Sequence, residues 1–114
     1  MLRPLTISFA LLFLVSLSAD AQVTADRLRR ASDEPENWLT YSGSYSSIRH
    51  SLLDQISPEN VQDLKLAWVF QARSLENFTA TPLVVDGIMY VTQAPNDVVA
   101  LDAKTGRVFW VYNY

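Results

Sequence analysis

The side chains that could carry acid–base, nucleophilic or metal chemistry are few and scattered in this sequence. His50 is the only histidine, so a histidine zinc site or a serine–histidine dyad would depend on one residue in a loop. There is no cysteine, which excludes a disulfide framework and a thiol nucleophile. The three glycines, Gly43, Gly87 and Gly106, are dispersed rather than gathered in a phosphate-binding loop. We therefore expect His50 to be a surface or packing residue.

The carboxylates are placed for solvent and turns rather than for catalysis. Asp33, Glu34 and Glu36 lie in a short polar segment and are expected to be solvated. Asp97 and Asp102 flank an apolar run, where such side chains typically accept hydrogen bonds from the backbone of turns. The net charge is −3, and this mild acidity argues against a nucleic acid partner. No catalytic set is expected within these residues.

Four short apolar runs separated by turns occupy the stretch 81–112. The runs are Leu83–Val85, Ile88–Thr92, Val98–Leu101 and Arg107–Tyr112. They are too short for helices and rich in Val, Ile and Tyr, which favours strands. Asp86-Gly87 between the first two is a strong hairpin signal, because the turn requires positive φ. The sequence predicts a four-stranded antiparallel meander, and successive apolar positions in its runs indicate burial on both faces.

The last of these runs has an earlier counterpart. Lys65–Phe70 (KLAWVF) and Arg107–Tyr112 (RVFWVY) share a basic residue, an apolar pair, Trp, Val and an aromatic, with starts 42 positions apart. A period of about 40–45 residues with four strands per unit is typical of β-propeller blades. We predict a mainly all-β chain with a lone outer strand at Lys65–Ala72 and one complete blade after it. A generic sandwich is the alternative on these residues alone.

The first 21 residues resemble a secretory signal peptide. Arg3 precedes an apolar core at Ile7–Leu17, and small residues at Ala19 and Ala21 predict cleavage before Gln22. The alternative is a membrane anchor, but the core is shorter than the roughly 20 residues that span a bilayer. We expect an exported chain, most simply periplasmic, with no membrane span after cleavage.

Residues 22–64 are predicted to form a loop-rich lead-in with two short helices. Thr24 is suited to cap a helix at Ala25–Ala31, and Ser57 to cap a second that begins at Pro58 and ends near Leu64. The aromatic residues of the lead-in are either packing anchors or part of a ligand rim; these are Trp38, Tyr41 and Tyr45. A sheet with two apolar faces requires neighbours, and repeat folds generally need at least three units. We therefore expect residues 65–114 to be part of something larger.

The turn after the third run has a physical logic of its own. Gly106 accepts the left-handed conformation, while Asp102 and Thr105 can bond free backbone groups. Ala100 is small and leaves room for an indole ring from a neighbouring unit, and Trp110 supplies such a ring in turn.

At these residues the chain resembles the quinoprotein alcohol dehydrogenases, which use pyrroloquinoline quinone (PQQ). Their docking motif, Ala-x-Asp-x-x-Thr-Gly-x-x-x-Trp, is met at every defined position by Ala100–Trp110. Further segments follow the opening of that family in order; these are Asn37–Gly43, Leu53–Val61, Leu64–Phe70 and Thr81–Trp110. The resemblance implies an eight-bladed propeller that oxidises small alcohols in the periplasm. It also implies PQQ beside Ca²⁺ or a lanthanide ion, a cytochrome-type electron acceptor, and further blades as partners.

The resemblance places one cofactor contact within this chain. The family has a Glu that touches PQQ two residues before the Thr-Pro of the first inner strand, and Thr79 stands there. Thr79 is thus expected near the cofactor without the charge, and Glu76 is expected to point elsewhere. The family's metal ligands and catalytic aspartate come later than Tyr114. The resemblance therefore implies a fragment that is inactive alone, and the alternative is a non-enzymatic exported scaffold acting through protein contacts.

Overall fold

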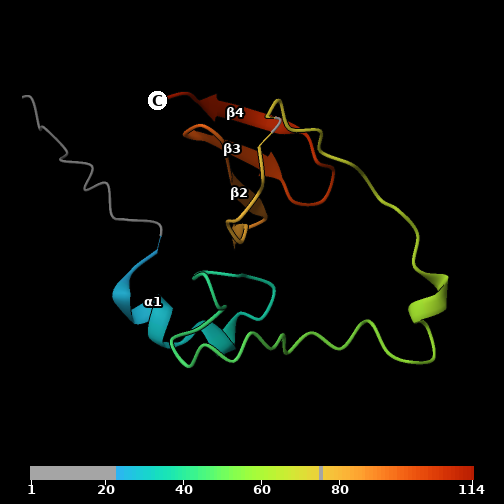
Figure 1. Ribbon diagram of the computed structural model, residues 1–114. Coiled ribbons are helices and arrows are strands. Elements are labelled where there is room, and N and C mark those ends of the chain that lie inside the picture. The colour runs from blue at the N-terminus through green and yellow to red at the C-terminus, as the bar shows by residue number, and fades with distance from the viewer. Residues whose placement is uncertain (1–22, 75) are drawn as a thin grey trace, which may run out of the picture.

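The computed structural model describes residues 23–74 and 76–114, so the predicted signal peptide lies outside the described residues. The chain consists of a loop-rich lead-in and an antiparallel sheet (Figure 1). The sheet contains β1 (Leu83–Val85), β2 (Ile88–Gln93), β3 (Asp97–Asp102) and β4 (Val108–Tyr112) in the order β1-β2-β3-β4. The predicted meander and the mainly all-β class are confirmed.

The β1–β2 hairpin is closed by the turn that the sequence indicated. Asp86 and Gly87 have φ of 51° and 78°, which is the pair of left-handed conformations that a two-residue hairpin turn requires. Val85 and Ile88 are then directly paired across the hairpin. The longer β2–β3 ladder runs from Ile88 opposite Asp102 to Gln93 opposite Asp97.

The sheet is covered on both faces along its third strand. Val99, Ala100 and Leu101 are consecutive and are all at most 1% exposed. Neighbouring side chains of a strand point to opposite faces, so burial of all three requires cover on each side. Leu101 and Val99 belong to a core cluster with Val91, against which Phe70 packs from outside the sheet. The prediction of a two-faced sheet is confirmed at β3.

The first predicted helix forms, but it is shorter than expected. Helix α1 covers Ala25–Arg29, and the Thr24 side chain accepts a hydrogen bond from the Arg27 backbone N–H at 3.1 Å. The predicted cap is therefore confirmed. At Arg30 the backbone leaves the helical region (φ −106°, ψ 26°), and a short 3₁₀ helix, η1 (Ala31–Asp33), follows.

The second predicted helix is wrong in extent. Only a 3₁₀ turn, η2 (Val61–Asp63), is present, and its first residues lack a side-chain cap. The Asn60 carboxamide explains the change, because its Oδ1 accepts from Ser57 N–H (2.8 Å) while its Nδ2 donates to the Gln55 carbonyl (2.9 Å). These bonds close a turn around residues 55–60 where a helix would have to start.

The outer strand predicted at Lys65–Ala72 is not observed as a strand. Residues 65–72 belong to no helix or strand and join no ladder within the described part of the chain. A strand is defined by the neighbour that completes its hydrogen bonds, and none of the four strands here pairs with this segment. Phe70 and Trp68 nevertheless pack against the sheet and its last turn.

Candidate functional site

The turn between β3 and β4 is held by the Asp102 side chain. Its Oδ1 accepts from the backbone N–H groups of Lys104 (2.9 Å) and Thr105 (3.0 Å), and its carbonyl accepts from Gly106 N–H at 2.8 Å. The N–H groups of Lys104 first and then of Thr105, together with the positive charge of Arg107, hold the pKa of the Asp102 carboxyl below its usual range. Gly106 has a φ of 71°, which few residues other than glycine adopt. The turn is thereby fixed in one shape.

The indole ring of Trp68, which precedes the sheet in the chain, packs against this turn. The Nε1 of Trp68 donates to the Ala103 carbonyl at 3.2 Å. A Cβ added to Gly106 would lie only 2.5 Å from Cε3 of Trp68. Glycine is therefore required at position 106 for its φ and for the space it leaves. Sequence reasoning aligned Trp68 with Trp110 but did not place Trp68 on this turn, although the 42-residue echo contained the signal.

Within the sheet, Ala100 lies between two aromatic residues of the neighbouring strands. Tyr90, Ala100 and Trp110 lie side by side across β2, β3 and β4, and Ala100 is fully buried. The rings of Tyr90 and Trp110 approach to 6.0 Å between centroids with a 53° tilt. The small side chain thus makes room for two rings of its own sheet. Trp110 remains 47% exposed, so much of this indole is available to another surface.

Thr79 lies at the opposite end of the sheet from the β1–β2 turn. It is exposed and lines an open hollow of about 380 Å³. The hollow is bounded by loop and strand-end residues; these are Asn77, Thr79, Ala80, Thr92, Gln93, Ala94, Pro95, Asn96, Asp97 and Val98. Glu76 is not among them. The family resemblance predicts that Thr79 lies near the cofactor, but it does not identify the polar residues that line the hollow beside Thr79.

Gln93 and Asp97 form the polar floor of this hollow. Gln93 is 8% exposed, and its Nε2 donates to Asp97 Oδ2 at 3.1 Å. Hydrogen bonds from the Asn113 side chain and then from Gln93 lower the pKa of Asp97. An ionised carboxylate only accepts, so the amide nitrogen must face Asp97. The Gln93 Oε1 is buried without a partner among the described residues.

The residues around Thr79 do not by themselves fit an anionic cofactor such as PQQ, which carries carboxylate groups. The lining of the hollow contains the carboxylate of Asp97 and an unpaired amide oxygen, but neither Lys nor Arg. Asn77 and Asn96 can donate N–H groups there, but no positive side chain of the lining would balance the negative charge of such a cofactor. No cluster of three or more His, Cys, Asp or Glu side chains placed for a metal ion is found among residues 23–74 and 76–114.

The aromatic residues of the lead-in differ in their roles. Trp38 is a packing anchor, because its indole lies against Gly43, where an added Cβ would sit 2.9 Å from the ring. Tyr41 is 56% exposed, and the Arg49 guanidinium stacks over it at 4.6 Å from the ring centroid. Hydrogen bonding from Arg49 lowers the pKa of the Tyr41 hydroxyl. Tyr45 and His50 are also exposed. No helix of the described residues has the length and apolar character that crossing a membrane demands.

Comparison with known proteins identifies the family. The sequence model for the PQQ-type "glucose/ethanol/alcohol dehydrogenase, beta-propeller domain" matches residues 38–114. The chain belongs to this family. Its sheet is one four-stranded unit of a propeller fold, and the PQQ-type resemblance found in the sequence is confirmed.

Relatives within the family are alcohol dehydrogenases. The chain is 47% identical over 100 residues to the dehydrogenase subunit of a quinone alcohol dehydrogenase of Acetobacter aceti, covering 87% of this chain and 14% of that subunit. A quinohemoprotein alcohol dehydrogenase of Comamonas testosteroni is 41% identical over 96 residues, which are 84% of this chain and 14% of the relative. The chain therefore spans a small part of the length of these relatives.

Solved structures give the same result. A quinohemoprotein alcohol dehydrogenase of Pseudomonas putida HK5 superposes with a TM-score of 0.76 at 43% identity, over 79% of this chain and 13% of that one. A europium-containing methanol dehydrogenase superposes with a TM-score of 0.71 at 38% identity, over 78% of this chain and 16% of that one. The blade and its lead-in therefore have counterparts within larger propeller enzymes.

Proposed function

We propose that this chain is the amino-terminal part of an exported quinoprotein alcohol dehydrogenase and is inactive without the remaining blades. The whole enzyme would oxidise small alcohols with PQQ beside Ca²⁺ or a lanthanide ion and pass electrons to a cytochrome-type acceptor. The family match and its alcohol dehydrogenase relatives support this reaction. A relative from Thauera butanivorans is a 1-butanol dehydrogenase whose name includes cytochrome c, which supports the acceptor.

The observation that carries the proposal is the docked Trp68 indole. Trp68 sits on the Gly106 turn, and Trp110 occupies the equivalent position one repeat later with nearly half of its surface exposed. We assign to Trp110 the equivalent seat on the glycine turn of a following blade. Residues 65–72, which pair with no strand of this sheet, would likewise serve as an outer strand that completes a different blade and closes the ring without open edges.

The proposed organisation of the chain has three parts. Residues 1–21 are an export signal, 22–64 the lead-in, and 65–114 a propeller strand followed by the first blade. Location in the periplasm follows from the signal. The docking motif, with Ala100, Asp102, Thr105, Gly106 and Trp110, then serves assembly rather than catalysis.

The cofactor's chemistry must be arranged by residues outside this chain. PQQ, when bound, supplies the two-electron acceptor for the alcohol. Thr79 contributes at most a hydroxyl that donates or accepts one hydrogen bond. Because the hollow beside it lacks a positive side chain, the groups that balance the cofactor's charge belong to the other blades.

A chimera tests the proposal. Residues 23–114 would replace the matching segment of the Acetobacter aceti dehydrogenase subunit, which is 47% identical, and the chimera would be assayed for PQQ binding and alcohol-dependent dye reduction. We expect the chimera to bind PQQ and to reduce the dye when alcohol is added, with the unmodified subunit as the positive control. A chimera that folds and binds PQQ but oxidises no alcohol would contradict the proposed reaction.

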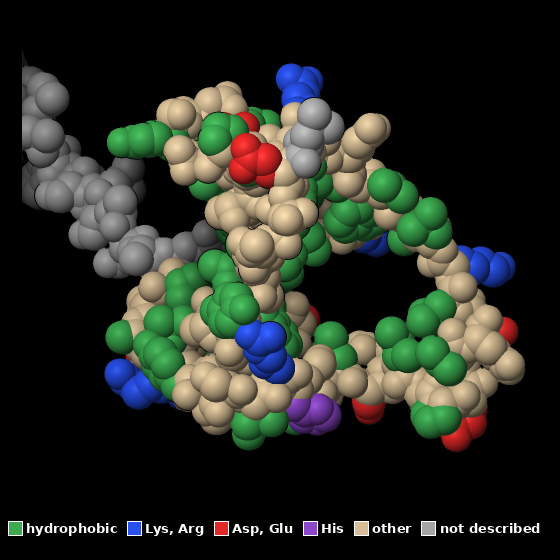
Figure 2. Space-filling view, in the orientation of Figure 1, with side chains coloured by type: hydrophobic (Ala, Val, Ile, Leu, Met, Phe, Trp, Pro, Cys, Tyr) green, Lys and Arg blue, Asp and Glu red, His purple; other side chains and the backbone are tan. Residues whose placement is uncertain are grey.

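The alternative of a non-enzymatic scaffold has one observation in its favour. All five residues of β4, Val108–Tyr112, are 44–56% exposed and apolar or aromatic, which makes this strand a surface for protein contacts. Figure 2 shows that hydrophobic side chains also occur over much of the visible surface. A chain that forms a defined oligomer, together with a chimera that neither binds PQQ nor oxidises alcohol, would favour the scaffold.

A further inference from the structure

The inner edge of the sheet is occupied by the lead-in. Strand β1 pairs with β2 on one side. On its other side Trp38 N–H donates to the Val84 carbonyl at 2.8 Å, and Val84 N–H donates to the Trp38 carbonyl at 3.0 Å. Leu39, the next residue, is 6% exposed. One residue of the lead-in thus takes the place of a fifth strand at the edge of β1.

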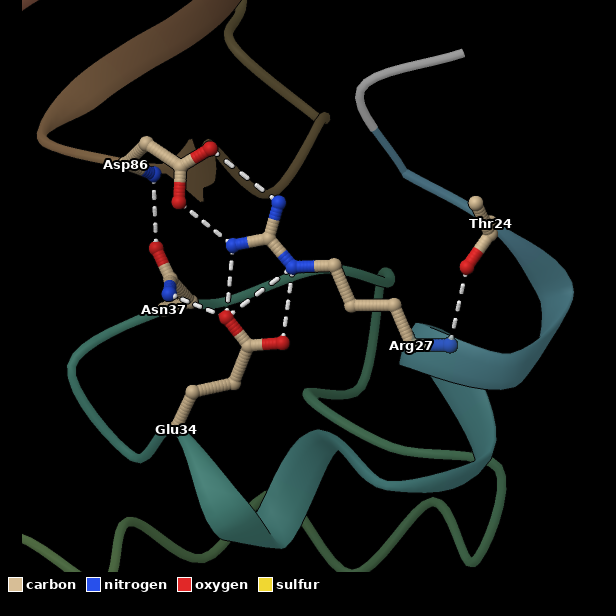
Figure 3. A network of polar contacts seen from close by, with 5 residues as sticks. All are labelled: Thr24, Arg27, Glu34, Asn37 and Asp86. Atoms are coloured by element: carbon tan, nitrogen blue, oxygen red, sulfur yellow. Dashed lines mark hydrogen bonds and ion pairs between the residues drawn. The ribbon is translucent and has the colours of Figure 1, made fainter. Parts of the chain in front are cut away.

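A charged network fastens the lead-in to the β1–β2 turn (Figure 3). The Arg27 guanidinium lies between two carboxylates and is itself only 20% exposed. Its Nε donates to Glu34 Oε1 at 2.7 Å, and its Nη1 donates to Asp86 Oδ2 at 3.1 Å. Nη2 reaches both partners as well. Such two-pronged pairs between arginine and carboxylate are both stronger and more directional than single contacts.

Asn37 connects the network to the backbone bridge. Its Oδ1 accepts from Asp86 N–H at 2.8 Å, and its Nδ2 donates to Glu34 Oε2 at 2.6 Å. Asn37 is 9% exposed and directly precedes Trp38. Both the oxygen and the nitrogen of the carboxamide therefore have hydrogen-bond partners. Because Trp38 is the next residue, a movement of the Asp86 turn away from Asn37 would also displace the backbone bridge between Trp38 and Val84.

We propose that residues 24–39 form a strap that closes the inner edge of the sheet, with the Arg27–Asp86 pair as its latch. The strap is joined to β1 by only one backbone bridge, so the polar network supplies much of what keeps it in place. A strand edge with free N–H and C=O groups pairs readily with another chain. With the latch open, the N–H and C=O groups of Val84 at this edge lose their partners on Trp38.

The closed strap leaves only the β4 edge of the described sheet open to a partner strand. Strand β4 carries no neighbour on its outer side within the described part of the chain, whereas β1 is covered by Trp38. Partner strands are therefore directed away from the inner edge as long as the latch is closed. This inference concerns the chain's own fold and does not depend on the proposed reaction.

Amide hydrogen exchange on the full chain tests the latch. Arg27→Gln removes the charge that faces Asp86, and Arg29→Gln is the matched control, since Arg29 is an exposed residue of the same helix that pairs with Asp26. We expect the amides of Trp38 and Val84 to exchange at least ten-fold faster in Arg27→Gln. The β2–β3 ladder should keep its protection in both variants, and Arg29→Gln should behave as the wild type.

A second variant guards against an effect peculiar to position 27. Asp86→Asn removes the charge but keeps a residue that tolerates the φ of 51°. It should also accelerate exchange at Trp38 and Val84. The double variant should add little to Arg27→Gln, because the contact between Arg27 and Asp86 is already lost in that single variant. Unchanged exchange at the bridge, equal effects of Arg29→Gln, or loss of protection throughout the sheet would each overturn the proposal.

Discussion

Replacing Gly106 by alanine should destabilise the blade through a contact that can be separated from backbone strain. A Cβ at this position would lie 2.5 Å from Cε3 and 2.7 Å from Cδ2 of Trp68, so the indole must leave its seat. The left-handed backbone costs a residue with a Cβ about 1–2 kcal/mol. Loss of the hydrogen bond from Trp68 to Ala103 adds about 0.5–1.5 kcal/mol. Together the free energy of unfolding should fall by about 1.5–3.5 kcal/mol.

Gly87→Ala supplies the matched control. Gly87 has a similar φ of 78°, but an added Cβ there would meet nothing within 4 Å, so only the backbone cost of about 1–2 kcal/mol applies. Urea unfolding followed by tryptophan fluorescence gives both values. In Trp68→Ala, the further change of Gly106 to alanine should then cost no more than Gly87→Ala does. Equal losses in Gly106→Ala and Gly87→Ala, with Trp68 present, would refute the assignment of the indole to this turn.

Three further predictions concern the same contacts. Trp68→Phe keeps a ring on the turn but removes the Nε1–H donor, so the free energy of unfolding should fall by about 1 kcal/mol in urea unfolding, against Phe70→Leu as a packing control. Ala100→Leu should overpack the space between the rings and cost about 1–3 kcal/mol, with loss of the ring-current shifts of Tyr90 in NMR spectra; unchanged shifts would contradict the packing described. Acidification should loosen the lead-in, because the hydrogen bond from Arg27 lowers the pKa of Glu34 below its ordinary 4.5. The stabilisation from this pair is therefore fully present above pH 4.5. It is lost as the pH falls through the lower pKa that Glu34 has in the folded state. The exchange protection factor of the Val84 amide, corrected for intrinsic rates, should fall over that range and should do so far less in Glu34→Gln.

The local features of the sheet could be predicted from the sequence. Asp86-Gly87 indicates its turn because few other residue pairs adopt two left-handed conformations, and the short Val-rich runs indicate strands whatever their partners. The Thr24 cap is equally local, since it depends on residues three positions apart. Each of these signals is contained within a few neighbouring residues.

The features that could not be predicted depend on distant partners. Residues 65–72 have strand-like composition, but pairing depends on a neighbour that the sequence does not specify. Arg27 and Asp86 are 59 positions apart, and no periodicity links a helix residue to a hairpin turn across that distance. The hydrogen bonds of Asn60 that displace the second helix come from a side chain whose rotamer the sequence leaves open. The family motif identified Thr79 as the residue at the position of the cofactor-contacting Glu. The hydrogen bond between Gln93 and Asp97 beside it is evident only from the folded sheet.

We propose that the exposed Trp110 of this blade packs on the glycine turn of a following blade. Co-expression of residues 23–114 with an Acetobacter aceti subunit that lacks its matching segment, followed by co-purification and determination of the stoichiometry, tests this contact. We expect an equimolar complex that is retained by Tyr114→Ala and lost or strongly weakened by Trp110→Ala. No complex with the unaltered chain, or equal recovery with Trp110→Ala, would contradict it.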